Sequence, residues 1–494
     1  MSQNSPASSL IEIPFRQFIN GNWQNGSSSD SLAIHNPYTG DCLGAIQKAD
    51  ATDLDAAYRA AEVAQREWAA RLPKERAEVF RNALRLLEKN RAGIVEWSIA
   101  EAGSTRIKAE AEYGTVHAQM VEIASLPYRM TGHIIPIDVP GKESRVYRKP
   151  VGVVGAISPW NWPLTLSHRS IGPALALGNG VVLKPADETP VTGGLLLAWI
   201  YEQAGLPAGL LNVVVGDVAT IGDAFTLNAI PRVISFTGST SVGRHIAGLA
   251  AQAPTLKHVS LELGGNAPLV VLDDADVDQA VSAAVFGRFL HQGQICMSTN
   301  RIIVDQSLIP VFREAFLDRV RALKCGDPAD PATAIGPIIS RRHLDRLMAL
   351  IARALESGAN PLLSGMPTGQ VLPPHVFDAV DNSCELAQGE TFGPVVPLLT
   401  AKNEEDALLQ ANATEYGLTS AVFSRDEGRA LAFADRLDVG MTHINDITVS
   451  ASANNPFGGE KNSGIGRFGG DWILHEFTTD HWITVQRGKR VYPF

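Results

Sequence analysis

The sequence predicts an α/β protein of more than one domain, in which a parallel sheet is covered by helices on both faces. Three observations predict this class. At 494 residues the chain exceeds the size at which a single hydrophobic core stops growing. Between residues 151 and 272 short, wholly apolar runs alternate with helical patterns. Such runs lack the in-and-out alternation of a half-exposed strand, so they are typical of parallel strands buried on both faces.

The elements before this region begin with a turn-rich, strand-like segment over residues 1–50. From Thr52 to Glu101 apolar residues recur at i, i+3, i+4 and i+7, which predicts amphipathic helices. A further helical stretch is expected up to about Met130. The next segment, HIIPIDVPGKESRVYRKPVG, carries Pro and Gly turn signals and predicts an extended hairpin.

Within the alternating region the expected strands are VGVVGAI, GVVLKP, LLNVVVG, RVISFTG and APLVVL. Helices fit between them, and one of these, GGLLLAWIYEQAG, ends on a glycine. A second α/β region is predicted over roughly residues 275–455. The final segment, DHWITVQRGKRVYPF, alternates like a strand and has no helix after it. It therefore needs a partner, which we expect to be the 133–148 hairpin or another subunit.

Composition and charge argue against several classes of function. The net charge is −10 and no local Lys/Arg cluster reverses it, so a nucleic-acid surface is not expected. The longest apolar runs are of strand length, well below the ~20 residues of a membrane helix, and MSQNSPASSL does not resemble a signal peptide. We therefore expect no membrane association and a cytoplasmic location. Four scattered cysteines without C-x-x-C, and no His pair at zinc spacing, predict neither a metal site nor disulfides.

Two loops that follow predicted strands are candidates for binding a nucleotide. In VISFTGSTSVG a strand runs into a turn that begins at Gly238, and the helix after it offers free N–H groups to an anion. In VVLKPADET, Lys184 and Asp187 end a strand and suit a ribose diol. The alternatives are an ordinary βα turn and a solvated charge pair. A third motif, GIGRFG, does not follow a strand, so we interpret it as a tight structural turn.

Three residues are candidates for catalysis, and each has a structural alternative. Cys296, in HQGQICMSTNR, follows a helix that Gly293 breaks; it is either a reactive thiol or an inert small apolar residue. Glu262 lies between two leucines, where partial burial would raise its pKa and make it a general base, unless it is a surface residue. Asn161 lies between two tryptophans and is either an oxyanion donor or part of an aromatic core turn. We interpret His168 and His291 as structural.

Taken together, these segments resemble the aldehyde dehydrogenase superfamily over nearly the whole chain. The ordered motifs are PWNWPL, KPADET, FTGSTSVG, ELGGNAP, GQICMS, GETFGPV, YGLTS and PFGG. The resemblance implies a Rossmann-type cofactor-binding domain over residues 1–132 and 149–264 and an α/β catalytic domain over residues 265–460. It also implies a small β oligomerisation element over residues 133–148 and 478–494, and hence a homodimer or homotetramer.

The same resemblance implies the roles of individual residues. Cys296 is implied as the nucleophile, Glu262 as the base that activates water, and Asn161 with the Cys296 backbone N–H as the oxyanion hole. The implied cofactor-binding residues are Ile157, Ser158, Trp160, Lys184, Asp187, Gly216, Gly238, Ser239, Val242, Glu390 and Phe392. The implied cofactor is NAD. NADP is possible because Asp187 stands where Glu is usual, and its shorter side chain disfavours a 2′-phosphate less strongly.

For the substrate, FLHQGQICMSTNRIIV and RFGG look most similar to the benzaldehyde, salicylaldehyde and vanillin dehydrogenase branch. This implies oxidation of an aromatic or medium-chain aliphatic aldehyde to the acid through a thiohemiacetal and a thioester. The expected pocket residues are Trp162, Arg169, Ile295 and Met297. Arg169 could instead favour a semialdehyde that carries a carboxylate. Transfer of the acyl group to coenzyme A is a less favoured alternative, because Glu262 would activate water.

Overall fold

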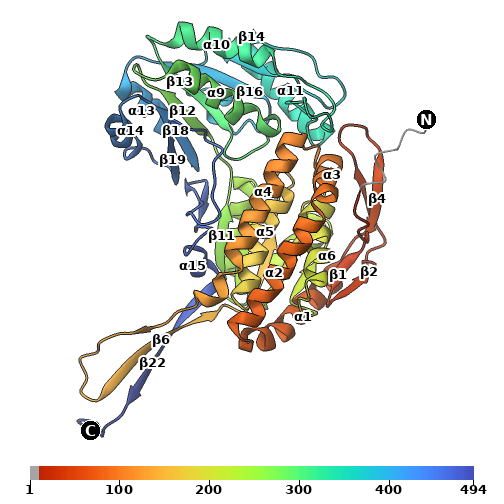
Figure 1. The fold of residues 1–494 in the computed structure, drawn as a ribbon, viewed down its shortest axis with the longest axis vertical. Coiled ribbons are helices and arrows are strands. Elements are labelled where there is room, and N and C mark those ends of the chain that lie inside the picture. Colours follow the sequence, from red (N-terminus) through yellow and green to blue (C-terminus); the bar gives the residue numbers. More distant parts are fainter. Residues whose placement is uncertain (1–9) are drawn as a thin grey trace.

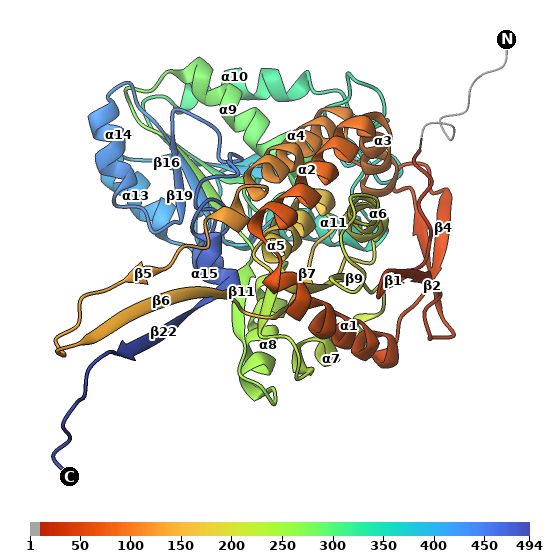
Figure 2. The same cartoon turned by 60° about the horizontal axis from the view of Figure 1, so that its bottom comes forward.

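The computed structural model describes residues 10–494 and places the chain in two large sheets and one small, projecting sheet (Figures 1 and 2). The first sheet has the strand order β2–β1–β9–β8–β7–β10–β11–β21. Its strands are β1 (Gln17–Ile19), β2 (Asn22–Gln24), β7 (Val153–Ile157), β8 (Gly180–Lys184), β9 (Leu211–Val213), β10 (Val233–Thr237), β11 (His258–Glu262) and β21 (Gly464–Ile465). Strands β7 to β11 are parallel and have the spatial order 3-2-1-4-5, so the order reverses between β7 and β10.

Both faces of this sheet are buried, as the unbroken apolar strands predicted. On β8 the neighbouring residues Val181 and Val182 point to opposite faces and belong to two different hydrophobic clusters. The first cluster contains residues of α5, and the second contains residues of α1. Helix α1 (Ala51–Ala70) packs on β8 and β9, and α5 (Pro163–Ala176) packs on β7 and β8.

The helical segment before the sheet divides where the sequence supplies caps. Asp50 forms a capping box at the start of α1, Pro73 opens α2 (Pro73–Lys89), and α3 (Arg91–Ala102) ends at Gly103 with a φ of 62°. Helix α4 (Arg106–Ile123) ends earlier than the predicted Met130, and only a 3₁₀ turn around Pro127 follows it. Three helices connect the remaining strands of this sheet: α6 (Leu196–Gln203), α7 (Asp223–Leu227) and α8 (Thr240–Gln252).

The second sheet is built from residues 267–444 and has the order β14–β15–β16–β13–β12–β18–β19. All of its neighbours are parallel except β14 and β15. Its strands are β12 (Ala267–Val271), β13 (Thr299–Asp305), β14 (Asn360–Leu363), β15 (His375–Asp378), β16 (Val395–Ala401), β18 (Thr419–Phe423) and β19 (Met441–Ile444). The helices of this region are α9 (Val277–Phe289), α10 (Ile309–Arg321), α11 (Arg341–Glu356), α12 (Glu385–Gln388), α13 (Glu404–Asn412) and α14 (Glu427–Ala434).

The third sheet projects from the body as a long arm (Figures 1 and 2). Strand β22 (Thr478–Gln486) pairs antiparallel with β6 (Lys142–Pro150) over nine residue pairs, and β5 (His133–Ile134) pairs with the other edge of β6. The prediction that the terminal strand pairs with the hairpin is confirmed. Short helix α15 (Ile473–Phe477) leads into β22, and two small sheets, β3 (Ser31–His35) with β4 (Cys42–Gln47) and β17 (Tyr416–Gly417) with β20 (Glu460–Lys461), complete the chain. Over residues 10–494 the longest apolar stretch of any helix falls short of what a membrane crossing requires.

Candidate active site

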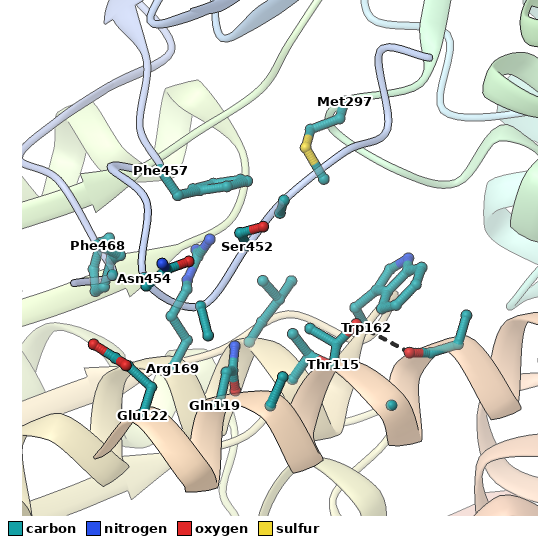
Figure 3. A pocket seen from close by; sticks show the side chains of 18 of the residues that line it. Thr115, Gln119, Glu122, Trp162, Arg169, Met297, Ser452, Asn454, Phe457 and Phe468 are labelled. Atoms are coloured by element: carbon teal, nitrogen blue, oxygen red, sulfur yellow. Dashed lines mark hydrogen bonds between the residues drawn. The ribbon is translucent and has the colours of Figure 1, made fainter. Parts of the chain in front are cut away.

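A cavity of about 730 Å³ lies between helices α4 and α5, the Cys296 loop and the segment before β22. All four predicted pocket residues line it, as do Cys296 and Asn161. Figure 3 shows Trp162, Arg169 and Met297 pointing into this space from different sides. Segments more than 300 residues apart in the sequence therefore contribute to one site. Further lining residues, which sequence reasoning did not identify, include Thr115, Gln119, Glu122, Asn454, Phe457 and Phe468.

The loop that carries Cys296 has an unusual backbone conformation. His291, Gln292 and Gly293 are consecutive residues with positive φ angles of 50°, 57° and 73°. Left-handed conformations cost energy for residues other than glycine and persist only where surrounding contacts enforce them. The side-chain amide of Gln292 donates to the Pro337 carbonyl at 2.9 Å, and Gln294 Oε1 accepts from the Ile339 backbone at 3.0 Å. These contacts hold the loop in place and position the cysteine at the end of the cavity.

Asn161 faces this loop from the turn before α5. Its Nδ2 donates to the Gln294 carbonyl at 2.9 Å, and the side chain is buried. This hydrogen bond fixes the orientation of the amide and leaves the second N–H of Nδ2 available. Among residues 10–494 no acceptor takes the backbone N–H of Cys296. Asn161 and Cys296 both line the cavity, and each keeps an N–H group without a protein acceptor in the described chain, which is an arrangement that suits an oxyanion.

The predicted nucleophile Cys296 is partly buried, the predicted base Glu262 is buried, and both groups have raised pKa values. Burial raises the pKa of the Cys296 thiol to about 12, while the Arg169 guanidinium and the Met297 N–H act in the opposite direction. Glu262, the last residue of β11, is buried, and neither carboxylate oxygen has a hydrogen-bond partner in the described chain. Burial raises its pKa to about 8, against the opposing charges of Arg169 and Arg467. The expectation of a buried Glu262 with a raised pKa is met by the structure.

The two glycines after Glu262 lie where a side chain would not fit. A Cβ on Gly265 would lie 2.1 Å from the Cys296 carbonyl oxygen, and a Cβ on Gly264 would lie 2.9 Å from Glu390 Oε2. Only glycine lets this backbone pass between the nucleophile loop and Glu390. The next residue is Asn266. Its side chain donates to the Ala387 and Gln388 carbonyls, so it ties β12 to the loop that carries Glu390.

Glu390 and Phe392 lie in the loop after α12, and Glu390 approaches Gly264. Glu390 Oε1 accepts from the Gly265 N–H at 3.0 Å, and burial raises the Glu390 pKa to about 7. The Phe392 ring stands edge-to-face against Trp160 with centroids 5.3 Å apart. Sequence reasoning missed His343 on α11, whose Nε2 lies 2.7 Å from the Phe392 carbonyl oxygen and whose ring packs on Trp160. No local motif marks His343, because only the fold brings α11 to this loop.

The predicted nucleotide residues lie around the carboxyl ends of β7, β8 and β10. Lys184 Nζ is 3.1 Å from Asp187 Oδ1, with the lysine buried and the aspartate partly exposed. Ser239 is the N-cap of α8 and makes no side-chain capping bond, so the first N–H groups of that helix remain available. Ile157 ends β7 and Ser158 follows it, Gly238 follows β10, and these positions flank the point where the strand order reverses. Gly216 follows β9, and Val242 is exposed on the first turn of α8.

Arg169 is buried beside the cavity in an aromatic clamp. Its guanidinium carbon lies 4.4 Å from the ring centroid of Phe457 and 4.7 Å from that of Phe468, and Nη2 donates to Thr237 Oγ1 at 3.2 Å. Its Nε has no partner within residues 10–494. Over the same residues no three His, Cys, Asp or Glu side chains gather in a way that could hold a metal ion.

Comparisons with known proteins agree with this site. The aldehyde dehydrogenase family model matches residues 23–483. The chain is 48% identical to a benzaldehyde dehydrogenase, YfmT, of Bacillus subtilis, covering 97% of this chain and 98% of the relative. It is 49% identical to a vanillin dehydrogenase of Corynebacterium glutamicum, covering 96% and 98%. The crystal structure of an NAD-dependent benzaldehyde dehydrogenase from C. glutamicum matches with a TM-score of 0.89 at 46% identity, over 97% and 99% of the two chains. The sequence resemblance is confirmed: the chain belongs to the aldehyde dehydrogenase family of oxidoreductases.

Proposed function

We propose that the protein oxidises an aromatic aldehyde to the carboxylic acid with NAD, through a covalent intermediate on Cys296. The observation that carries the proposal is that the cavity is lined by the Cys296 thiol together with two N–H donors without a protein acceptor, one on the Asn161 amide and one on the Cys296 backbone. The relatives named as benzaldehyde and vanillin dehydrogenases support the aromatic substrate class. Trp162, Phe457 and Met297 supply apolar walls that suit an aromatic ring.

In the first half of the reaction, Cys296 Sγ attacks the aldehyde carbon and gives up its proton to solvent. The carbonyl oxygen becomes an oxyanion, which the Asn161 amide and the Cys296 backbone N–H stabilise. The tetrahedral adduct then expels hydride and leaves a thioester on Cys296. NAD, when bound, supplies the acceptor for that hydride. An aldehyde has no other leaving group, which is why a covalent adduct on sulfur is useful here.

In the second half, Glu262 takes a proton from water, and the water attacks the thioester. The acid leaves, and the sulfur takes the proton that Glu262 carries and returns to the thiol. A carboxylate with a pKa of about 8 is a stronger base than an ordinary glutamate, and a useful fraction of it is ionised near neutral pH. Because a base for water stands in the site, hydrolysis is favoured over transfer of the acyl group to coenzyme A.

The residues present fit a dinucleotide. We infer that Lys184 and Asp187 hold the adenosine ribose, that Ser239, Gly238 and Val242 surround the pyrophosphate, and that Glu390 binds the nicotinamide ribose. Trp160, Phe392, Ile157, Ser158 and Gly216 complete the proposed site. The free N-terminus of α8 and the Lys184–Asp187 pair support the inference, because they offer an anion site and a diol site at one edge of a parallel sheet. NAD is the expected cofactor, and NADP is the alternative because Asp187 is short.

We further infer that the chain works as a homodimer or homotetramer. Strand β22 is a nine-residue edge strand whose Trp482 is 62% exposed and whose other edge is already paired with β6. A long unpaired edge with exposed apolar side chains suits pairing with a second copy. The proposed domains follow the sheets: residues 1–132 and 149–264, residues 265–460, and the arm of residues 133–148 and 478–494. The cytoplasmic location stays a prediction.

The test measures NADH or NADPH formation with benzaldehyde, vanillin, hexanal and succinic semialdehyde. We expect benzaldehyde and vanillin to have the highest kcat/KM, an acid product without coenzyme A, and loss of activity in Cys296→Ala. A second candidate function is the oxidation of a semialdehyde that carries a carboxylate. Arg169 favours it, since its buried guanidinium could pair with that carboxylate. A kcat/KM for succinic semialdehyde above that for benzaldehyde would replace the aromatic assignment with a semialdehyde. Undiminished NADH formation by Cys296→Ala would disprove the nucleophile.

A further inference from the structure

A polar amide faces the otherwise largely apolar cavity from helix α4. Gln119 is buried and lines the cavity. Its Oε1 lies 3.1 Å from His168 Nδ1, and among the described residues its Nε2 has no hydrogen-bond acceptor. Figure 3 shows the nitrogen end of this amide directed toward the cavity. An amide donor that the protein leaves unpaired at a cavity wall is available to a ligand.

The orientation of this amide follows from the hydrogen bonds behind it. His168 is fully buried in α5, and its Nε2 lies 2.9 Å from the Tyr201 hydroxyl on α6. Burial lowers the pKa of His168 to about 3, so the ring is neutral and carries a proton on only one nitrogen. The hydrogen bonds that link Tyr201, His168 and Gln119 can therefore be donated in only two consistent directions.

One direction satisfies every buried donor. If Tyr201 donates to Nε2, then Nδ1–H donates to Gln119 Oε1, and the amide N–H groups point to the cavity. If the hydrogen bonds were donated in the opposite direction, His168 Nε2–H would donate to the tyrosine oxygen. The Tyr201 proton would then be buried without an acceptor, because no other hydrogen bond of this hydroxyl exists in the described chain. An unsatisfied buried donor is costly, so the first direction is favoured. The core thus fixes Gln119 as a donor toward the cavity.

We propose that Gln119 is a specificity-determining residue, which donates a hydrogen bond from Nε2 to an oxygen substituent on the ring of the aldehyde. The inference rests on the proposed oxidation of aromatic aldehydes and adds a preference for ring hydroxyl or methoxy groups. An apolar surround strengthens such a bond and penalises a ring that leaves the amide unpaired. Thr115, one turn earlier on α4, cannot replace this donor, because its hydroxyl donates to the Ala111 carbonyl of its own helix.

The experiment compares matched substrates that differ only in the ring acceptor. We use 3- and 4-methoxybenzaldehyde against 3- and 4-ethylbenzaldehyde, with benzaldehyde as reference, and measure kcat and KM from NADH formation. Gln119→Met keeps the length and apolar bulk of the side chain and removes the amide. In this variant we expect kcat/KM for the preferred methoxy isomer to fall about three- to ten-fold relative to its ethyl partner, as loss of one neutral hydrogen bond predicts. The change should appear in KM, and benzaldehyde should change less than about two-fold.

Two further variants separate a specific role from a structural one. Tyr201→Phe leaves the cavity wall intact but removes the hydroxyl that fixes the tautomer of His168. We therefore expect the methoxy-to-ethyl ratio of kcat/KM to fall less than in Gln119→Met. Gln252→Met, an identical change on the exposed surface of α8, should leave the ratio unchanged. An unchanged ratio in Gln119→Met at both ring positions would overturn the inference. Equal losses on methoxy, ethyl and unsubstituted rings would do so as well, because they indicate a purely structural role. Failure of the wild-type protein to oxidise benzaldehyde at all would instead refute the proposed function.

Discussion

Glu262→Gln is the substitution that most directly tests the second half of the proposed reaction. The amide has nearly the same size as the carboxylic acid and cannot take a proton from water. Neither carboxylate oxygen of Glu262 has a hydrogen-bond partner in the described chain, so the substitution breaks no contact that holds β11 in place. The first half of the reaction uses Cys296 and Asn161 and should proceed. The expected result is a protein that forms the thioester once and then hydrolyses it slowly.

The structure gives the magnitude of the pH dependence. Burial raises the Glu262 pKa from 4.5 to about 8, which corresponds to about 5 kcal/mol of preference for the protonated form. Because the protonated form is favoured, the active carboxylate forms only as the pH rises through about 8. Roughly one tenth of the residue is ionised at pH 7 and roughly nine tenths at pH 9. A hydrolysis step that needs the carboxylate should therefore accelerate about ten-fold over this range.

The assay is stopped-flow NADH formation with benzaldehyde between pH 6 and 10. In Glu262→Gln we expect a burst of about one NADH per site, followed by a steady rate about 10²- to 10⁴-fold below wild type and nearly independent of pH. Glu314→Gln, an exposed change on α10, is the control for loss of one carboxylate and should behave as wild type. A wild-type steady rate that is flat from pH 7 to 9, measured where hydrolysis limits turnover, would contradict the assignment. So would a Gln variant without a burst.

Two further predictions concern cofactor choice and assembly. Asp187→Ser removes the carboxylate next to Lys184 and should raise kcat/KM for NADP relative to NAD by about ten-fold or more. The reason is that a 2′-phosphate would then meet Lys184 without a negative charge facing it. If parallel initial-rate assays with the two cofactors gave an unchanged ratio, the adenosine ribose would bind elsewhere. Deleting residues 478–494 removes β22 from the arm and should convert the oligomer to smaller species, measured by light scattering. Trp482→Ala should weaken assembly in a concentration-dependent way. If the truncated chain kept the mass of the full oligomer, the arm would not be the interface.

The ordered motifs and the family resemblance that they carry, more than any single local pattern, predicted the candidate site residues that lie on short continuous segments. Cys296, Glu262 and Asn161 each stand in a motif whose neighbours constrain the backbone, such as the Gly pair after β11, which lets the chain pass close to the Cys296 carbonyl. The parallel strands were likewise visible as unbroken apolar runs. The end of α4 was wrong by several residues, because Pro127 and the capping at Ala124 are weaker signals than the helical periodicity before them.

The contribution of α4 to the cavity was not predicted, although the sequence held a signal for it. Lys108, Glu112, Thr115 and Gln119 are spaced by four, three and four residues, so they form one polar stripe along the helix. A polar stripe normally faces solvent. Here Lys108 and Glu112 are completely buried as an ion pair, and the rest of the stripe faces the cavity. Only the packing of α4 on α5 distinguishes a solvated face from a buried one, and one sequence does not reveal which helices pack together.

The negative charge of Glu262 raises the pKa of the Cys296 thiol, which in the proposed reaction favours the use of the two groups at different steps. The Cys296 pKa is raised to about 12 by burial and further by the negative charges of Glu390 and Glu262, so thiolate and carboxylate are costly together. Arg169, held between two phenylalanine rings, is the single cation that lowers the pKa of both groups. One positive charge can offset one negative charge well and two poorly in a site of low dielectric. In the proposed reaction the attacking sulfur is anionic before the thioester forms, and Glu262 is needed as a carboxylate only when water attacks that thioester. The same guanidinium therefore serves the thiolate in the first half and the carboxylate in the second, because acylation removes the sulfur's charge at the point where the base must ionise.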